Sequence, residues 1–154
     1  MRITCLVVGR LKSGPERELT DEYLKRAAPI ARSLGFRGIE EVEVASGGGM
    51  DAEAERLLAK IPSGAKCIRL DEFGKSVRSK DFAADLGKWR DQGVPDLVFL
   101  IGGSDGYGDA VRAACPETMA FGPQTWPHRL VRVMLVEQIY RAVSIMAGTP
   151  YHKA

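Results

Sequence analysis

The stretch "DLVFLIGGSDGYGD", residues 96–109, sets an unbroken apolar run directly before a glycine-rich loop. Leu97 to Ile101 carry no polar side chain, and Gly102 and Gly103 follow at once. A short apolar run that ends in glycine is typical of a strand buried on both faces, as in a parallel sheet covered by helices. The stretch therefore predicts a central strand of such a sheet, with a loop at its carboxyl end.

Strand and helix patterns alternate on both sides of this stretch. β-branched or alternating runs predict strands over residues 2–8, 38–44, 65–70 and 118–122. Apolar residues three or four apart predict helices over residues 15–34, 51–61, 79–92, 108–115 and 125–145. This order predicts one α/β domain over residues 1–154, with a mostly parallel sheet and helices on both faces.

Three helix starts carry terminal signals. Asp51 and Ser79 are candidate N-caps, because their side-chain oxygens can accept a hydrogen bond from a free backbone N–H. Pro127 suits the first turn of the last helix, where its missing N–H costs nothing. We therefore expect Thr125 or Trp126 near the cap of that helix.

The composition is ordinary for a globular protein, with 45% hydrophobic and 27% charged residues and a net charge of +2. This charge favours anionic partners only weakly. No apolar run fits a secretory signal or a membrane span, so we expect a cytoplasmic protein with no membrane partner. Cys5, Cys67 and Cys115 lie far apart without a CxxC pair and histidine is scarce, so we expect reduced thiols and no metal site.

The glycine-rich loop, residues 102–109, is a candidate ligand site. Loops at the carboxyl ends of strands bind ligands in open α/β sheets, and glycine lets the backbone approach a ligand closely. The loop lacks the GxGxxG spacing of a dinucleotide site and follows the fourth strand instead of the first; the chain contains no GxxxxGK[ST] motif either. A tight strand-to-helix turn without a ligand is the alternative interpretation.

A second candidate site is the loop "FGPQTWP", residues 121–127, before the last helix. Its backbone groups belong to no helix or strand and can bind a purine-like ligand, over which Trp126 can pack. Trp126 can equally serve as an anchor of the core.

The last helix is apolar on nearly its whole circumference, whereas a surface helix has one apolar stripe. Glu137 and Arg141 are four residues apart and can form an ion pair, and Arg129 and Arg132 share a neighbouring face. The chain ends "GTPYHKA", in which an aromatic ring, an imidazole and a cation follow one another; a frayed terminus is the alternative interpretation.

The segments "FLIGG", "WPHRLVRVMLVEQIYRA" and "GTPYHK" together resemble the RlmH family, the pseudouridine N3-methyltransferases of large-subunit (23S) ribosomal RNA within the SPOUT superfamily. The resemblance covers essentially the whole chain. It implies a SPOUT α/β fold with a C-terminal trefoil knot, which no general rule of topology would suggest. It also implies a homodimer, in which a second subunit would cover the outer side of the last helix.

The resemblance implies that S-adenosylmethionine is the cofactor. The positions that match its pocket are Leu70, Gly103, Gly122, Pro123, Gln124, Thr125, Trp126 and Pro127. The family commonly has GGPEG where this chain has "GGSDG", and often leucine at the position of Trp126. A role carried by backbone groups is compatible with both changes.

The resemblance further implies methyl transfer to N3 of a pseudouridine on the ribosome. His152 is the candidate for handling the proton of the imide, because it alone in the tail titrates near neutrality. Tyr151 can stack on a base, and Arg132 can stabilise developing negative charge. His128 and Glu137 match the family's helix motif, and Arg129, Arg141 and Lys153 are candidate contacts to RNA.

Three other functions are compatible with parts of the sequence. The first is a SPOUT methyltransferase that acts on another RNA nucleotide. The second is a ribosome-binding module that has lost its cofactor and catalysis. The third is a flavodoxin-like binder, although "GRLKSGPE" after the first strand is a poor phosphate loop.

Overall fold

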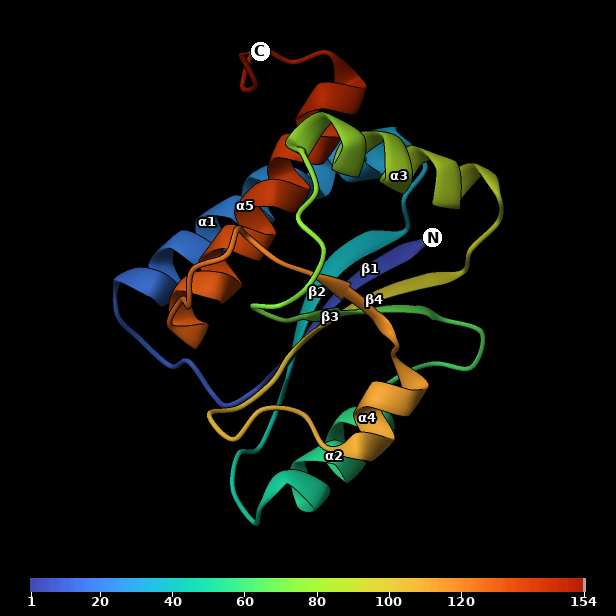
Figure 1. Ribbon diagram of the computed structural model, residues 1–154. Helices are drawn as coiled ribbons and strands as arrows, with labels where there is room; N and C mark the ends of the chain where they lie inside the picture. The colour runs from blue at the N-terminus through green and yellow to red at the C-terminus, as the bar shows by residue number, and fades with distance from the viewer. Residues whose placement is uncertain (154) are drawn as a thin grey trace.

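The computed structural model describes residues 1–153. Five parallel strands form one sheet in the order β2-β1-β4-β3-β5 (Figure 1). The bounds are Arg2–Val8 for β1, Gly38–Val44 for β2, Lys66–Leu70 for β3, Asp96–Ile101 for β4 and Glu117–Met119 for β5. The mostly parallel sheet predicted from the sequence is confirmed. The fifth strand is shorter than predicted and ends at Met119 instead of Gly122.

Helices cover both faces of the sheet, as predicted. Helices α1 (Pro15–Ser33), α3 (Ser79–Asp91) and α5 (His128–Ala147) lie on one face, and α2 (Met50–Leu58) and α4 (Asp109–Ala114) on the other (Figure 1). The central strand β4 pairs with β1 on one side and β3 on the other, and Leu97 to Ile101 are all buried. Its unbroken apolar run follows from this position.

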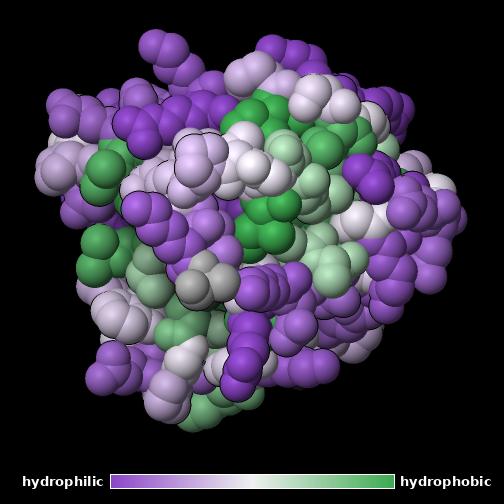
Figure 2. Space-filling view, turned by 90° about the horizontal axis from the view of Figure 1, so that it is seen from above, coloured by the Kyte–Doolittle hydropathy of each residue, from purple (hydrophilic) through white to green (hydrophobic). Residues whose placement is uncertain are grey.

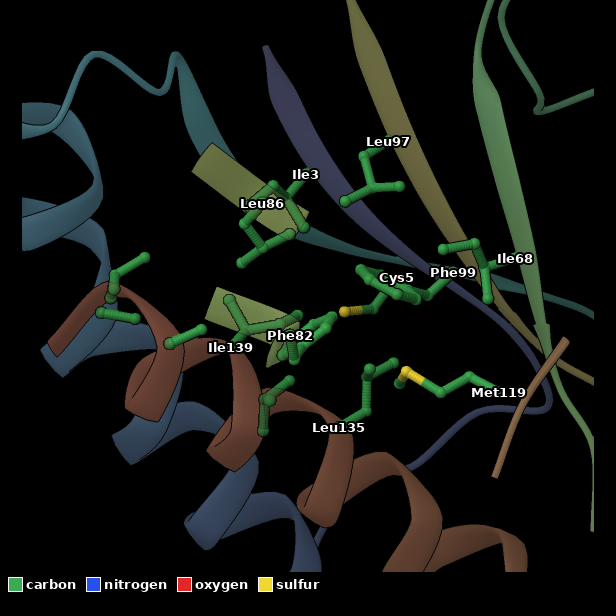
Figure 3. Close-up of a cluster of buried hydrophobic side chains, with 14 of the residues drawn as sticks. Ile3, Cys5, Ile68, Phe82, Leu86, Leu97, Phe99, Met119, Leu135 and Ile139 are labelled. Atoms are coloured by element: carbon green, nitrogen blue, oxygen red, sulfur yellow. The ribbon is translucent and has the colours of Figure 1, made fainter. Parts of the chain in front are cut away.

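The larger core lies between the sheet and the face that carries α5. Leu135 and Ile139 of α5 point toward Phe82 of α3 and toward Cys5 and Phe99 on the central strands (Figure 3). All five side chains are at most 4% exposed. Burial of this apolar area is the main stabilising contribution to the fold.

Helix α5 lies between α1 and α3, which explains most of its apolar circumference. The ring of Tyr140 lies 5.9 Å from that of Tyr23 on α1, and the Ser79 hydroxyl on α3 donates a 2.7 Å hydrogen bond to Gln138. The second subunit that the resemblance implies on the outer side of this helix stays a prediction. The chain itself covers both flanks of the helix, and Leu130 is the large apolar residue of α5 that stays exposed.

The predicted helix caps were wrong by one or two residues. Gly49 is the N-cap of α2, so Asp51 lies inside the first turn, where its charge complements the helix dipole. Arg78 caps α3, which frees the Ser79 hydroxyl for Gln138. Pro127 caps α5, so Thr125 and Trp126 belong wholly to the preceding loop.

The segment after β5 runs beside the loop after β3. The Ala120 N–H donates a 2.9 Å hydrogen bond to the Lys75 carbonyl, and Ser76 pairs with Ala120 in a parallel bridge. This pairing brings two distant loops together at the carboxyl edge of the sheet, where a SPOUT knot would form. The trefoil knot itself stays a prediction. Among residues 1–153, no helix is long and apolar enough to cross a membrane.

Candidate active site

A cavity of about 340 Å³ opens at the carboxyl edge of the sheet. The loops after β3, β4 and β5 line it, because the ends of parallel strands meet at one edge. Six of the eight predicted cofactor positions lie in its wall: Leu70, Gly103, Gly122, Gln124, Thr125 and Trp126. Pro123 and Pro127 are exposed residues of the same loop and lie outside the wall.

The Tyr107 hydroxyl holds two of these loops together behind the cavity. It accepts a 3.1 Å hydrogen bond from the Gly102 N–H, and its own proton lies between the carbonyls of Leu70 and Leu100, at 2.8 and 2.9 Å. Burial raises the pKa of this phenol well above its ordinary value. Tyr107 therefore stays neutral and fixes the ends of β3 and β4 against each other.

Replacing Tyr107 by phenylalanine should lower the free energy of unfolding by about 1–3 kcal/mol, because the buried Gly102 N–H loses its partner. Urea denaturation measures this change. Tyr140→Phe is the matched control: the Tyr140 hydroxyl takes part in none of the hydrogen bonds found within residues 1–153, so stability should change by less than about 0.5 kcal/mol. Equal losses in the two variants would contradict the role assigned to Tyr107.

Two glycines of the loop are required by the side chains behind them. A Cβ atom on Gly102 would lie 3.1 Å from the Tyr107 ring, and one on Gly103 would lie 2.9 Å from Oε1 of Glu53. Both distances are shorter than ordinary van der Waals contact. Gly102 and Gly103 thus allow close packing behind the cavity wall, and they also let a ligand approach the backbone from the cavity.

The mouth of the cavity carries polar and aromatic groups. The Thr125 hydroxyl donates a hydrogen bond to Glu72, and the Trp126 indole donates one of 3.0 Å to the Phe121 carbonyl. Trp126 is 36% exposed, so it is a wall residue and not the core anchor of the alternative interpretation. His128, the first residue of α5, lines the same cavity.

Arg132 lies in a buried ion cluster and is absent from the cavity wall. It is 4% exposed, and its guanidinium donates to Glu41 at 3.1 Å, to Glu43 at 2.5 Å and to the Gly9 carbonyl at 3.1 Å. Burial raises the pKa of Glu43, but hydrogen bonds from the Leu11 N–H and from Arg132 outweigh it and hold that pKa below its ordinary value. The cluster ties α5 to the ends of β1 and β2.

The tail folds back onto the end of α5 and forms a second cluster. Tyr151 donates a 3.0 Å hydrogen bond to Glu137, to which Arg141 donates one of 2.9 Å, so the predicted Glu137–Arg141 pair is confirmed. Nη1 of Arg141 lies 3.1 Å from Nδ1 of His152. The Tyr151 ring packs at 4.4 Å from that of Tyr140. Three side chains of α5 therefore hold the tail through His152, which is not frayed.

The structure separates this tail cluster from the cavity. His128 lies in the cavity wall at the first residue of α5, whereas Tyr151 and His152 follow the last residue, Ala147 (Figure 1). The partners of the tail, Glu137 and Arg141, lie nine to thirteen residues after His128, which is about 14–20 Å along the helix. The predicted cofactor residues and the predicted catalytic tail residues therefore form two separate groups along one helix.

The face near the tail displays apolar side chains surrounded by hydrophilic ones (Figure 2). The half-buried Ile145 and Met146 at the end of α5 line a shallow hollow together with Leu34 and Gly87. Arg129, near the other end of α5, and Lys153 in the tail are exposed.

Sequence reasoning did not identify Tyr107 or Glu53. A large aromatic residue among the glycines of "GGSDGYG" was a usable signal for Tyr107. Glu53 resembles any acidic residue near a helix start, so the sequence carried no signal for it.

The family described as "Predicted SPOUT methyltransferase" matches residues 1–152. The chain is 65% identical over 154 residues to "Ribosomal RNA large subunit methyltransferase H" of Hyphomonas neptunium, and each chain is covered completely. The chain belongs to the RlmH family of SPOUT methyltransferases. Proteins of the same name from Nitrobacter winogradskyi and Rhodopseudomonas palustris (strain HaA2) are 52% and 49% identical to it, with at least 99% of each chain covered. The family resemblance found in the sequence is confirmed.

Proposed function

We propose that this protein transfers the methyl group of S-adenosylmethionine to N3 of a pseudouridine in large-subunit ribosomal RNA, on the assembled ribosome in the cytoplasm. The observation that carries the proposal is the cavity at the carboxyl edge of the sheet, in a chain 65% identical to a ribosomal RNA large subunit methyltransferase H.

The cavity suits an adenosine cofactor in its chemistry. The backbone of residues 122–126 belongs to no helix or strand, so N–H and C=O groups of this segment are available to a purine edge, and Trp126 supplies an aromatic wall. Leu70 and Met119 supply apolar surface. A few polar groups in a mostly apolar cavity are typical of small-molecule sites.

The chemistry requires that the imide N3 lose its proton to solvent water, that the lone pair of N3 attack the methyl carbon, and that the electron pair of the S–C bond stay on sulfur. The enzyme must therefore stabilise the imide anion and hold N3 in line with the methyl group. A guanidinium can only donate hydrogen bonds, so Nδ1 of His152 accepts the hydrogen bond from Arg141. The ring proton of His152 therefore lies on Nε2. This favours donation of a hydrogen bond from His152 to the imide oxygen over direct proton abstraction.

The proposal includes a homodimer whose active site combines two subunits. The tail cluster contacts Glu137 and Arg141, about 14–20 Å along α5 from His128 in the cavity wall. The cavity and the tail cluster can act on one substrate when the tail of one subunit meets the cavity of its partner. The apolar face near the tail is a suitable surface for that contact, because exposed apolar patches of this kind mark interaction sites (Figure 2).

The surface contacts to RNA are assigned by charge and exposure. Arg129 and Lys153 are exposed and free to neutralise phosphates. Arg141 is half-buried between Glu137 and His152, so its assigned role is to orient the histidine at the RNA. Tyr151, held by Glu137, keeps one ring face against Tyr140.

The test is incubation of the protein with labelled S-adenosylmethionine and ribosomes that lack the modification, followed by digestion and mass spectrometry. We expect label on N3 of a pseudouridine of large-subunit RNA. Label on another nucleotide would replace the proposed substrate by a different RNA target. Cofactor binding without label on any RNA, or no cofactor binding at all, would contradict the proposal and favour a non-catalytic ribosome-binding module.

A further inference from the structure

Glu53 is a buried carboxylate that lacks a counter-charge. It lies on α2, on the face of the sheet opposite α5, and is 5% exposed. Its Oε2 accepts a 2.9 Å hydrogen bond from the Gly47 N–H, whereas Oε1 is buried without any hydrogen-bond partner. None of the ion pairs found within residues 1–153 includes it. Burying a polar or charged group without a partner lowers the stability of the fold. A buried carboxylate oxygen without a partner therefore indicates a functional role.

The free oxygen of Glu53 lies directly behind the cavity wall. A Cβ atom on Gly103 would be 2.9 Å from Oε1, and Gly103 is itself a wall residue. A glycine at this position therefore keeps the carboxylate close to the cavity without a side chain in between. Glu53 is buried, and a charge acts over a longer range in a protein interior than in water.

The other acidic residues at this cavity wall already have ion-pair or hydrogen-bond partners. Asp71 forms ion pairs with Arg69 at 3.0 Å and Arg112 at 3.9 Å. Glu72 is exposed and accepts the hydrogen bond of Thr125. Glu53 is thus the acidic residue near this cavity that is buried and forms no ion pair within the described chain.

We propose that Glu53 is a cofactor-specificity residue that favours the cationic sulfonium of S-adenosylmethionine over the neutral thioether of S-adenosylhomocysteine. This inference rests on the proposed function. The bound sulfonium supplies a positive charge near the buried carboxylate. Glu53 therefore has a counter-charge only while S-adenosylmethionine is bound. The unpartnered Oε1 and its position behind Gly103 are the observations that carry it.

Methyl transfer removes this attraction. The S–CH3 bond breaks with its electron pair on sulfur, the N3–CH3 bond forms, and the cofactor loses one positive charge. The product then binds less tightly and is released more easily. Since the positive charge on sulfur already falls in the transition state, Glu53 binds the ground state more strongly and does not accelerate the chemical step. Removing the charge of Glu53 should therefore raise KM for the cofactor without lowering kcat.

The test is the substitution Glu53→Gln, which keeps the shape and the acceptor for Gly47 but removes the charge. Isothermal titration calorimetry measures the Kd of S-adenosylmethionine and of S-adenosylhomocysteine for both proteins. We expect the Kd of S-adenosylmethionine to rise about tenfold, as for one charge removed at about 10 Å in a medium of effective dielectric constant about 20. The Kd of S-adenosylhomocysteine should stay nearly constant, and kcat should not fall.

Glu55→Gln is the matched control, because Glu55 is an exposed acid on the same helix; it should leave both affinities unchanged. A partly unfolded Glu53→Gln protein would show a lower binding stoichiometry but the same ratio of affinities, so the ratio is the decisive quantity. Equal weakening of both ligands, or no weakening of either, would overturn the inference. Failure of the wild-type protein to bind S-adenosylmethionine would instead contradict the proposed function.

Discussion

Replacing Arg132 by methionine should lower the free energy of unfolding by about 3–5 kcal/mol, the largest stability loss we expect from a single substitution in this chain. Methionine keeps most of the apolar stem but leaves Glu41 and Glu43 with less positive charge in a buried cluster. The Gly9 carbonyl also loses a donor. Glu41 retains Arg17 as a partner, and Glu43 retains the Leu11 N–H, so we expect the lower end of this range. Urea denaturation near neutral pH measures the loss.

The pH dependence of this loss distinguishes charge from packing. The pKa of Glu43 is held below its ordinary value in the folded protein, so its stabilising contribution is present above the ordinary pKa of about 4.3 and is lost as pH falls through the folded value. The difference between wild type and Arg132→Met should therefore shrink in acid, where Glu43 becomes neutral. Arg129→Met is the control on the exposed side of α5 and should change stability little. A loss that is independent of pH would indicate packing alone.

Replacing His152 by alanine should reduce methyl transfer to ribosomal RNA by roughly 10²–10³-fold, the cost of removing one hydrogen-bond donor aimed at developing negative charge. Binding of S-adenosylmethionine should stay intact, because His152 lies at the end of α5 away from the cavity. Single-turnover methylation and calorimetry measure the two quantities separately. Unchanged turnover would reject a role of His152 in the reaction.

Mixed dimers test whether the tail of one subunit acts together with the cavity of its partner. His152→Ala keeps a normal cavity, and Gly122→Val keeps a normal tail but strains a loop glycine whose φ is 86°. Each variant alone should be inactive as a homodimer. Mixing the two should restore a clear fraction of activity, since the cavity of one subunit then meets the tail of the other. No recovery in verified mixed dimers would place cavity and tail in the same subunit and contradict the composite site.

Local patterns were sufficient for most of the fold. The apolar run of residues 97–101 and the alternation of strands and helices predicted a parallel sheet covered on both faces, because strand and helix periodicities are properties of neighbouring residues. The helix caps were less predictable. Asp51 and Ser79 have the right chemistry for a cap, but tertiary contacts and the glycine before α2 moved each helix start.

The candidate site, like the fold, could be predicted from the sequence only in part. Motifs close in sequence identified Gly103, Gly122 and Trp126, which the structure places in one cavity. The sequence did not show that Arg132 turns away from this cavity into a cluster with Glu41 and Glu43, nearly ninety positions earlier in the chain. A charged residue on a helix carries no local sign of the partner it meets across the fold.

The class of the sheet, the family and the loops that line the cavity could be predicted from the sequence, because these depend on short-range periodicity and on motifs of fixed spacing. The packing of distant segments was needed to show that α1 and α3 cover α5, that the tail cluster lies further along that helix than the cavity wall, and that Glu53 faces Gly103. These features join residues from distant parts of the chain, and it is the packing of the sheet and its helices that brings such residues into contact.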